Sequence, residues 1–184
     1  MKRRIYNLWA GYWGLIIPLG LKLVLHLFSI GRYGFHRDEF LYLVQGEHLQ
    51  WGYLEVPPFI ALVGRTATAI FGTSLVGIRL FPLAASITVL WLIDRMVRRM
   101  GGGNQAALIA GLAFVLSPVF LRTGLLFQPV VFDQLCWTLV AWWVLCLGQE
   151  ESRKIWICLG VTIGVAVLVK YTIAFYVLAL PVSY

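Results

Sequence analysis

The chain has 184 residues, of which 60% are hydrophobic and 12% are charged, and its formal net charge is +7. Soluble domains carry about one quarter charged residues, so this sequence has too little polar surface for a water-soluble globule, and we predict an integral membrane protein. In a soluble chain this positive charge would suggest nucleic-acid binding. In a membrane protein, basic residues instead mark the cytoplasmic side, so we expect no nucleic-acid partner.

Long apolar runs predict an all-α, polytopic membrane protein. A spanning helix needs roughly 20 apolar residues. The candidate spans cover residues 8–30, 75–97, 105–122, 129–148, 155–169 and 171–184. The last two share one apolar block that "VKYT" interrupts. Two interpretations stay open there: a tight turn between short spans, or one long tilted helix with Lys170 reaching the membrane surface. Residues 1–184 form a single transmembrane domain in either case.

The distribution of Lys and Arg predicts how the chain is oriented. If the N-terminus is cytoplasmic, short inner segments hold Lys2, Arg3, Arg4, Arg95, Arg98, Arg99, Arg153 and Lys154. The opposite face holds Arg32, Arg37, Arg65, Arg79, Arg122 and Lys170. Half of the latter, Arg32, Arg37 and Arg65, lie in one long loop, and long loops count less in this rule. We therefore predict a multi-pass protein of the plasma (inner) membrane with a cytoplasmic N-terminus.

The loop from Gly31 to about Ser74 is too long for a connector and too apolar for a tail. Residues 38–51 have a moderately amphipathic pattern, which is typical of a helix that lies in the membrane interface. Pro58 can open a second helix over about 58–71, because the first turn of a helix tolerates a missing N–H. We expect two interfacial helices in this first outer loop.

Acidic residues gather on the predicted outer side. A carboxylate at the edge of a bilayer is costly unless it is paired or faces water. Carboxylates can deprotonate a hydroxyl or amine, and Arg and Lys can hold a phosphate. The pattern suits transfer of a group from a phosphate-bearing lipid. The acids on this side are Asp38, Glu39, Glu47, Glu55 and Asp133. We expect Asp38, Glu39 and Asp133 to converge with several cations on one outer cavity.

Each of these residues also has a purely structural interpretation. Asp38 and Glu39 can cap the interfacial helix, since acids favour the first turn. Asp133 can pair with Arg122, and Glu55 can be an ordinary loop acid. Arg79 and Lys170 lie near outer span ends, where snorkelling to the membrane surface alone can explain them. Lys22 and His26, at i,i+4 spacing in the first span, share a face: they could line the cavity, or snorkelling plus one hydrogen bond could explain them.

The order of motifs resembles the N-terminal part of GT-C integral-membrane glycosyltransferases, in the group of protein O-mannosyltransferases, aminoarabinose transferases and RgtA/B/C/D-like enzymes. The motifs are "RDEFLY" after the first span, "YLEVPPF", an Arg opening the second span in "GIRLFPLAASITVLWL", Asp133 near the outer end of the fourth span, and "GVAVLVKYT". Relatives often have His or Lys where this chain has Val56. Because these enzymes are longer, we expect the chain to be an N-terminal portion of such an enzyme.

The resemblance implies a GT-C helical bundle and an active site on the outer, periplasmic face. Asp38 would be the general base and Glu39 its neighbour in the catalytic site. The implied substrate-binding residues are Asp133, Arg79, Lys170, Glu55 and Arg37. The donor would be a sugar on a polyprenyl phosphate, transferred with inversion to a lipid, glycan or protein acceptor.

Two further points stay open at this stage. The sequence predicts no cofactor and no metal ligands, although a divalent metal could assist the transfer. The rival function is a non-catalytic one, in which a truncated remnant or a transport protein uses the same charges to bind a lipid headgroup without chemistry.

Overall fold

The computed structural model describes the backbone of residues 2–179 and the side chains of residues 11–179. Within this range the chain forms helices and no strands, which confirms the all-α prediction. Residues 180–184 and the side chains of Lys2, Arg3 and Arg4 lie outside the described residues. The helices are α1 (Lys2–Ser29), α2 (Arg37–Glu47), α3 (Phe59–Phe71), α4 (Leu75–Arg99), α5 (Asn104–Leu116), α6 (Pro118–Leu125), α7 (Pro129–Leu147), α8 (Arg153–Val169) and α9 (Ile173–Ala179).

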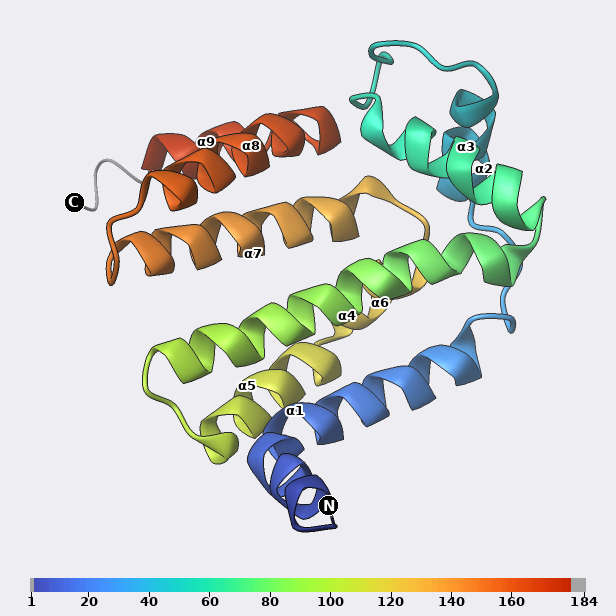
Figure 1. The fold of residues 1–184 in the computed structure, drawn as a ribbon. Coiled ribbons are helices and arrows are strands. Elements are labelled where there is room, and N and C mark those ends of the chain that lie inside the picture. The colour runs from blue at the N-terminus through green and yellow to red at the C-terminus, as the bar shows by residue number, and fades with distance from the viewer. Residues whose placement is uncertain (1, 180–184) are drawn as a thin grey trace.

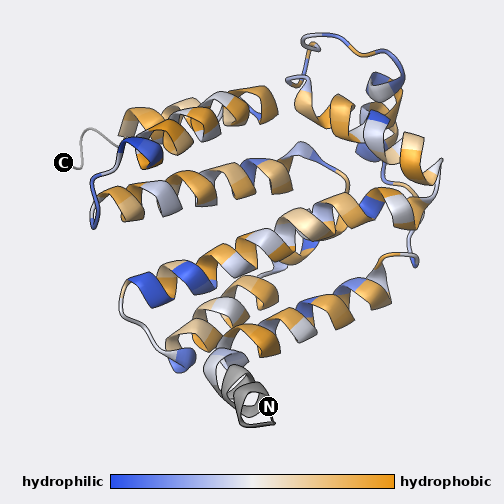
Figure 2. Ribbon diagram, in the orientation of Figure 1, coloured by the Kyte–Doolittle hydropathy of each residue, from blue (hydrophilic) through white to orange (hydrophobic). Residues whose placement is uncertain are grey.

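The longer helices lie side by side, and α2 and α3 pack together at one end of them (Figure 1). At this end, called here the α2–α3 end, α1 finishes and α4 and α7 begin. Hydrophilic residues gather at the opposite end, in the last turns of α4 and the first turn of α8 (Figure 2). The basic residues of that end include Arg98, Arg99 and Lys154.

Among the described residues, three helices are long and apolar enough to cross a membrane: Gly11–Ser29, Leu75–Arg99 and Pro129–Leu147. They coincide with three of the six predicted spans. The predicted spans 155–169 and 171–184 correspond to α8, with 17 residues, and α9, with 7 residues. The six crossings stay a prediction. The helical content and the three apolar helices make the chain a polytopic membrane protein.

The predicted span 105–122 is broken in two. Helices α5 and α6 meet at an angle of 66°, and they qualify as a span only if the bent pair is counted as one. Ser117 lies between them in an extended conformation and Pro118 begins α6. Proline disfavours helical geometry in the residue before it and has no N–H to continue the helix. The bend turns α6 towards the α2–α3 end.

Glycines let α2 and α3 approach closely. A Cβ on Gly46 in α2 would lie 2.8 Å from the backbone N of Arg65 and 3.0 Å from the carbonyl oxygen of Ala61, both in α3. A Cβ on Gly64 would likewise lie 3.1 Å from the carbonyl oxygen of Tyr42. Small residues allow two helix backbones to pack at short range, so these glycines fix how the two helices cross.

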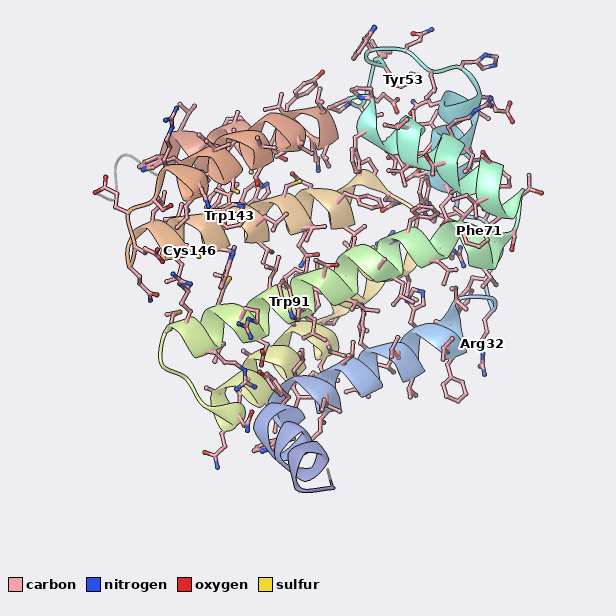
Figure 3. The ribbon with its side chains drawn as sticks, viewed as in Figure 1. Arg32, Tyr53, Phe71, Trp91, Trp143 and Cys146 are labelled. Carbon is pink, nitrogen blue, oxygen red and sulfur yellow. The ribbon has the colours of Figure 1, made fainter. Side chains whose placement is uncertain are left out.

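The loop between α2 and α3 is held by Tyr53, whose side chain is labelled in Figure 3. Its hydroxyl donates to the carbonyl oxygens of Gln45 (2.8 Å) and His48 (2.9 Å) and accepts from the backbone N–H of Gln50 (3.1 Å). These bonds close the loop onto the end of α2, so the two helices and their connection form one structural unit.

Candidate functional site

The first turn of α2 carries the acidic pair. His36 precedes the helix, and its Nδ1 accepts from the backbone N–H of Asp38 at 3.3 Å. Glu39 completes a capping box, because its Oε2 accepts from the backbone N–H of His36 at 2.7 Å. Such caps satisfy backbone N–H groups that a helix start leaves unpaired. The capping interpretation of Glu39 is therefore correct, although capping is only part of its role.

Glu39 also forms a buried, two-pronged ion pair with Arg79 near the start of α4. Arg79 Nε donates to Oε1 at 3.0 Å and Nη2 donates to Oε2 at 2.8 Å. A further bond to Oε1 comes from the backbone N–H of Phe127 at 2.8 Å, just before α7. The Glu39 side chain is 0% exposed and that of Arg79 is 3% exposed. One carboxylate thus joins the beginnings of α2, α4 and α7.

Arg79 uses its remaining N–H groups to hold the segment that follows α1. Nη1 donates to the carbonyl oxygens of Ile30 (2.9 Å) and Tyr33 (3.1 Å), and Nη2 donates to that of Gly34 (2.9 Å). A guanidinium has five N–H donors. The two bonds to Glu39 and the three bonds to these carbonyl oxygens together engage all five. In this conformation Arg79 has no donor left for the lipid phosphate that the resemblance would give it.

The surroundings of Glu39 favour its charged form. Burial by itself would raise the pKa of the carboxyl. The hydrogen bonds from Arg79, Phe127 and His36, together with the charge of Arg79, outweigh burial and lower the pKa below its usual range. Glu39 is therefore ionised, fully hydrogen-bonded and shielded from solvent, which suits a structural carboxylate.

Asp38 is in a different situation from its neighbour. Its side chain is 33% exposed. Its Oδ2 accepts from Gln128 Nε2 at 3.0 Å, and Oδ1 lies 3.5 Å from the Nε of Arg37. Arg37 itself is 94% exposed and makes no other ion pair among the described residues. Asp38 is therefore held in place by Gln128 while lone pairs on its carboxylate stay open to solvent.

Tyr42 follows Asp38 by one helical turn. Burial, and then the negative charges of Asp38 and Glu55, raise the pKa of the Tyr42 hydroxyl. Asp38 and Tyr42, one helical turn apart, lie on the same side of α2. The convergence of Asp38, Glu39 and Asp133 on one cavity stays a prediction.

A cavity of about 690 Å³ lies beside the residue that precedes α2. Its wall includes His36, whose Nδ1 is 3.7 Å from Asp38 Oδ2. The rest of the wall comes from the segment after α1 and from α6, with the basic residues Arg79 and Arg122 and apolar residues such as Leu121 and Leu125. A pocket of this size can hold a sugar-sized ligand.

Asp133 lies in the first turns of α7 and faces a second cavity of about 640 Å³. It is 8% exposed. Its Oδ1 accepts from Trp137 Nε1 at 3.0 Å, and its Oδ2 accepts from Thr172 Oγ1 at 2.9 Å. Its partners are thus neutral groups, and the alternative ion pair with Arg122 is not formed. Lys170, two residues from Thr172, is half-buried at the end of α8.

The described residues contain no group of three or more His, Cys, Asp or Glu side chains arranged to hold a metal ion. Asp38, Glu39 and Asp133 are instead engaged with Arg, Gln, Trp and Thr side chains and with backbone N–H groups.

Comparison with protein-family models decides the family. Residues 55–184, well over half of the chain, match the model described as dolichyl-phosphate-mannose-protein mannosyltransferase. The chain belongs to this family. Membership confirms the resemblance seen in the motifs and implies a membrane glycosyltransferase whose sugar donor is carried on a polyprenyl phosphate. No curated protein and no solved structure matched the chain.

The part that matches the mannosyltransferase family includes some of the candidate residues and not others. Glu55, Arg79, Asp133 and Lys170 lie inside it, whereas Arg37, Asp38 and Glu39 precede it. The roles of the acidic pair therefore depend on the geometry of the site rather than on the family match.

Sequence reasoning missed three contributors to the site. Gln128 orients Asp38, the backbone of Phe127 binds Glu39, and His36 caps α2. His36 could have been found, because it stands immediately before the predicted helix. Gln128 is the one polar side chain between apolar residues in "LFQPVVF" and precedes a proline. Its contact with Asp38 spans 90 residues, so no local pattern could have predicted that contact.

Proposed function

We propose that the protein transfers a sugar, with inversion, from a polyprenyl-phosphate donor to an acceptor at the α2–α3 end, on the outer face of the plasma (inner) membrane. Asp38 is the general base. The observation that supports this role is the difference within the acidic pair. Glu39 is buried and fully hydrogen-bonded, whereas Asp38 is partly exposed and its Oδ2 lies 3.7 Å from Nδ1 of His36, a residue that lines the 690 Å³ cavity.

The reaction follows from the groups at hand. Asp38 takes the proton of an acceptor hydroxyl, whose oxygen attacks the anomeric carbon of the sugar. The bond from that carbon to the phosphate oxygen breaks, and the lipid phosphate leaves with the electron pair. A phosphate needs positive charge to stabilise it as it leaves, rather than a strong acid. A single displacement inverts the anomeric carbon.

The other candidate residues take supporting roles in this proposal. Glu39 and Arg79 are positioning residues, because their ion pair fixes the start of α2 on which Asp38 stands. Glu55 and Tyr42 flank Asp38 and contact the acceptor. Asp133, held by Thr172 and Trp137, shapes the neighbouring cavity. Lys170 and the exposed Arg37 supply positive charge at the rim of the site.

The test is transfer of radiolabelled mannose from a polyprenyl phosphate in membranes that contain the protein. Asp38→Asn removes the base but keeps the size of the side chain, and we expect a loss of about a hundredfold or more in rate. Glu47→Gln, an exposed acid at the other end of α2, is the matched control and should retain full activity. Wild-type rates in Asp38→Asn would contradict the role of Asp38. Donor binding without any transfer would favour the non-catalytic rival.

A further inference from the structure

A group of buried polar side chains in the bundle is used neither by the fold nor by the proposed chemistry. Lys22 and His26 in α1 and Ser86 in α4 are each 1% exposed. Both ring nitrogens of His26 and the hydroxyl of Ser86 have no hydrogen-bond partner within the part of the chain that the structure describes. Buried polar groups are nearly always hydrogen-bonded, so this exception needs an explanation.

Lys22 is also under-satisfied. Its ammonium has three N–H donors, and its one hydrogen bond among the described residues is a long one of 3.4 Å to the carbonyl oxygen of Phe120. It lies 5.9 Å from the centre of the Phe114 ring. No carboxylate pairs with it in the described residues. An unpaired cation inside a membrane protein is costly and indicates a functional site.

Lys22 and His26 line a recess between α1 and α6. Lys22, His26 and Ser29 follow one another at i, i+4 and i+7, so they form one stripe on α1. Together with Leu25, Leu121 and Leu125 they enclose a cavity of about 100 Å³. That volume exceeds the roughly 30 Å³ share of a single water molecule in the liquid, so the recess has room for a small polyatomic group.

The recess adjoins the 690 Å³ cavity that His36 lines. Ser29, Leu121 and Leu125 line both spaces. No Asp or Glu side chain lines either cavity, and besides the phenol of Tyr33 the ionisable groups that line them are basic: Lys22, His26, His36, Arg79 and Arg122. Arg79 is already neutralised by Glu39, and His36 lies near Asp38. The uncompensated positive charge is therefore concentrated at Lys22, next to the unpaired ring of His26, and at Arg122.

We propose that the recess binds the phosphate group of the lipid carrier, with Lys22 as its counter-charge and the His26 ring as a hydrogen-bond partner. The apolar leucines of the wall suit the first isoprene unit of the chain. This inference rests on the proposed function for the identity of the lipid. It moves the phosphate contact from Arg79, whose donors are all engaged, to groups that lack partners.

Gly124 offers a second substitution that tests the same site. A Cβ at this position would lie 2.7 Å from Lys22 Nζ and 2.9 Å from Ser86 Oγ. The lysine end is flexible, so Gly124→Ala displaces the ammonium without changing any charge. Lys22→Met instead removes the charge and keeps a long apolar side chain.

The experiment measures binding to the purified full chain in detergent by competition against a photoreactive polyprenyl monophosphate. We expect Lys22→Met to lower the affinity about tenfold or more, as the loss of a charge-assisted hydrogen bond predicts, and Gly124→Ala to lower it less. Lys154→Met, which changes an exposed lysine at the opposite end of the bundle, should bind as the wild type does. Thermal unfolding should show Lys22→Met to be no less stable than the wild type, since it removes an unpaired buried charge.

The competitors distinguish the source of the phosphate. Competition by polyprenyl monophosphate, with polyprenol and inorganic phosphate ineffective, supports the lipid carrier. Competition by millimolar inorganic phosphate supports the same recess as a site for the phosphate group alone. Equal affinity in wild type and Lys22→Met, or equal competition by polyprenol, would overturn the proposal. Binding that depends on Lys22 without any sugar transfer would support the recess and count against the proposed function.

Discussion

Helix α4 carries an ion pair near each of its ends, and the two pairs differ in how far apart the paired residues lie in the sequence. At the α2–α3 end, Arg79 bonds to Glu39, which lies 40 residues earlier in the chain. At the opposite end, Arg98 Nε bonds to Asp94 at 2.9 and 3.0 Å, one turn away in the same helix. The local pair supports one helix end, whereas the distant pair fixes three helices and the segment after α1. The distant pair therefore holds the start of α2, and with it Asp38, in position.

The largest expected effect comes from breaking the distant pair. Glu39→Gln leaves the charge of Arg79 buried without a counter-ion, which typically costs about 3–5 kcal/mol. Unfolding of the purified protein by heat or by a denaturing detergent measures the loss. Arg79→Met in the Glu39→Gln background should recover part of it, because the uncompensated charge is then gone. A stable single variant would show that the pair does not hold the site together.

A smaller loss is expected from the helix crossing that supports the same end. Gly46→Ala places a methyl group against the backbone N of Arg65 and the carbonyl oxygen of Ala61 in α3. Both are backbone atoms of a packed helix, so neither can move away freely. Overpacking of this kind costs about 1–3 kcal/mol. Gly52→Ala, in the loop between α2 and α3, meets nothing within 4 Å and is the matched control. Equal unfolding temperatures for the two variants would contradict the close crossing.

The local pair should matter less than the distant one. In Asp94→Asn, Arg98 keeps its hydrogen bond to Asn104 Oδ1 at 2.8 Å, and its side chain is 24% exposed. We expect a cost of about 1–2 kcal/mol, measured by the same unfolding assay. A loss as large as that of Glu39→Gln would remove the distinction between the two ends of α4.

The pH dependence sharpens the comparison further. The pKa of Glu39 is lowered on folding from its ordinary value of 4.5. Its contribution to stability is therefore complete above that value and is lost as the pH falls through the lowered folded-state pKa. The stability difference between wild type and Glu39→Gln should be constant above about pH 5 and shrink in stronger acid. A difference that grows as the pH falls would contradict the sign of the shift.

The fold could largely be predicted from the sequence, because long apolar runs and prolines are local signals. The helices of the first loop and the apolar helices Gly11–Ser29, Leu75–Arg99 and Pro129–Leu147 follow from such runs. The bend at Ser117 was missed, although Pro118 signals it. The prediction treated 105–122 as one apolar run and gave no weight to the proline.

The candidate site could be predicted only in part. Sequence reasoning placed Asp38, Glu39 and Arg79 at the same end of the protein, but it could not tell which groups would bond to one another. Glu39 pairs with Arg79 and leaves Asp38 open, and Asp133 pairs with Thr172, 39 residues away, instead of Arg122. These contacts depend on how distant helices pack, which no single-sequence pattern encodes. The catalytic roles themselves stay a proposal.

The most direct test of the account compares the two neighbours in the acidic pair. Asp38→Asn and Glu39→Gln are prepared in parallel, and each is assayed for thermal unfolding and for mannose transfer from a polyprenyl phosphate. The account predicts that Asp38→Asn unfolds as the wild type does and has lost transfer, whereas Glu39→Gln unfolds at a clearly lower temperature. An Asp38→Asn protein that transfers mannose at the wild-type rate, or a Glu39→Gln protein as stable as the wild type, would contradict it.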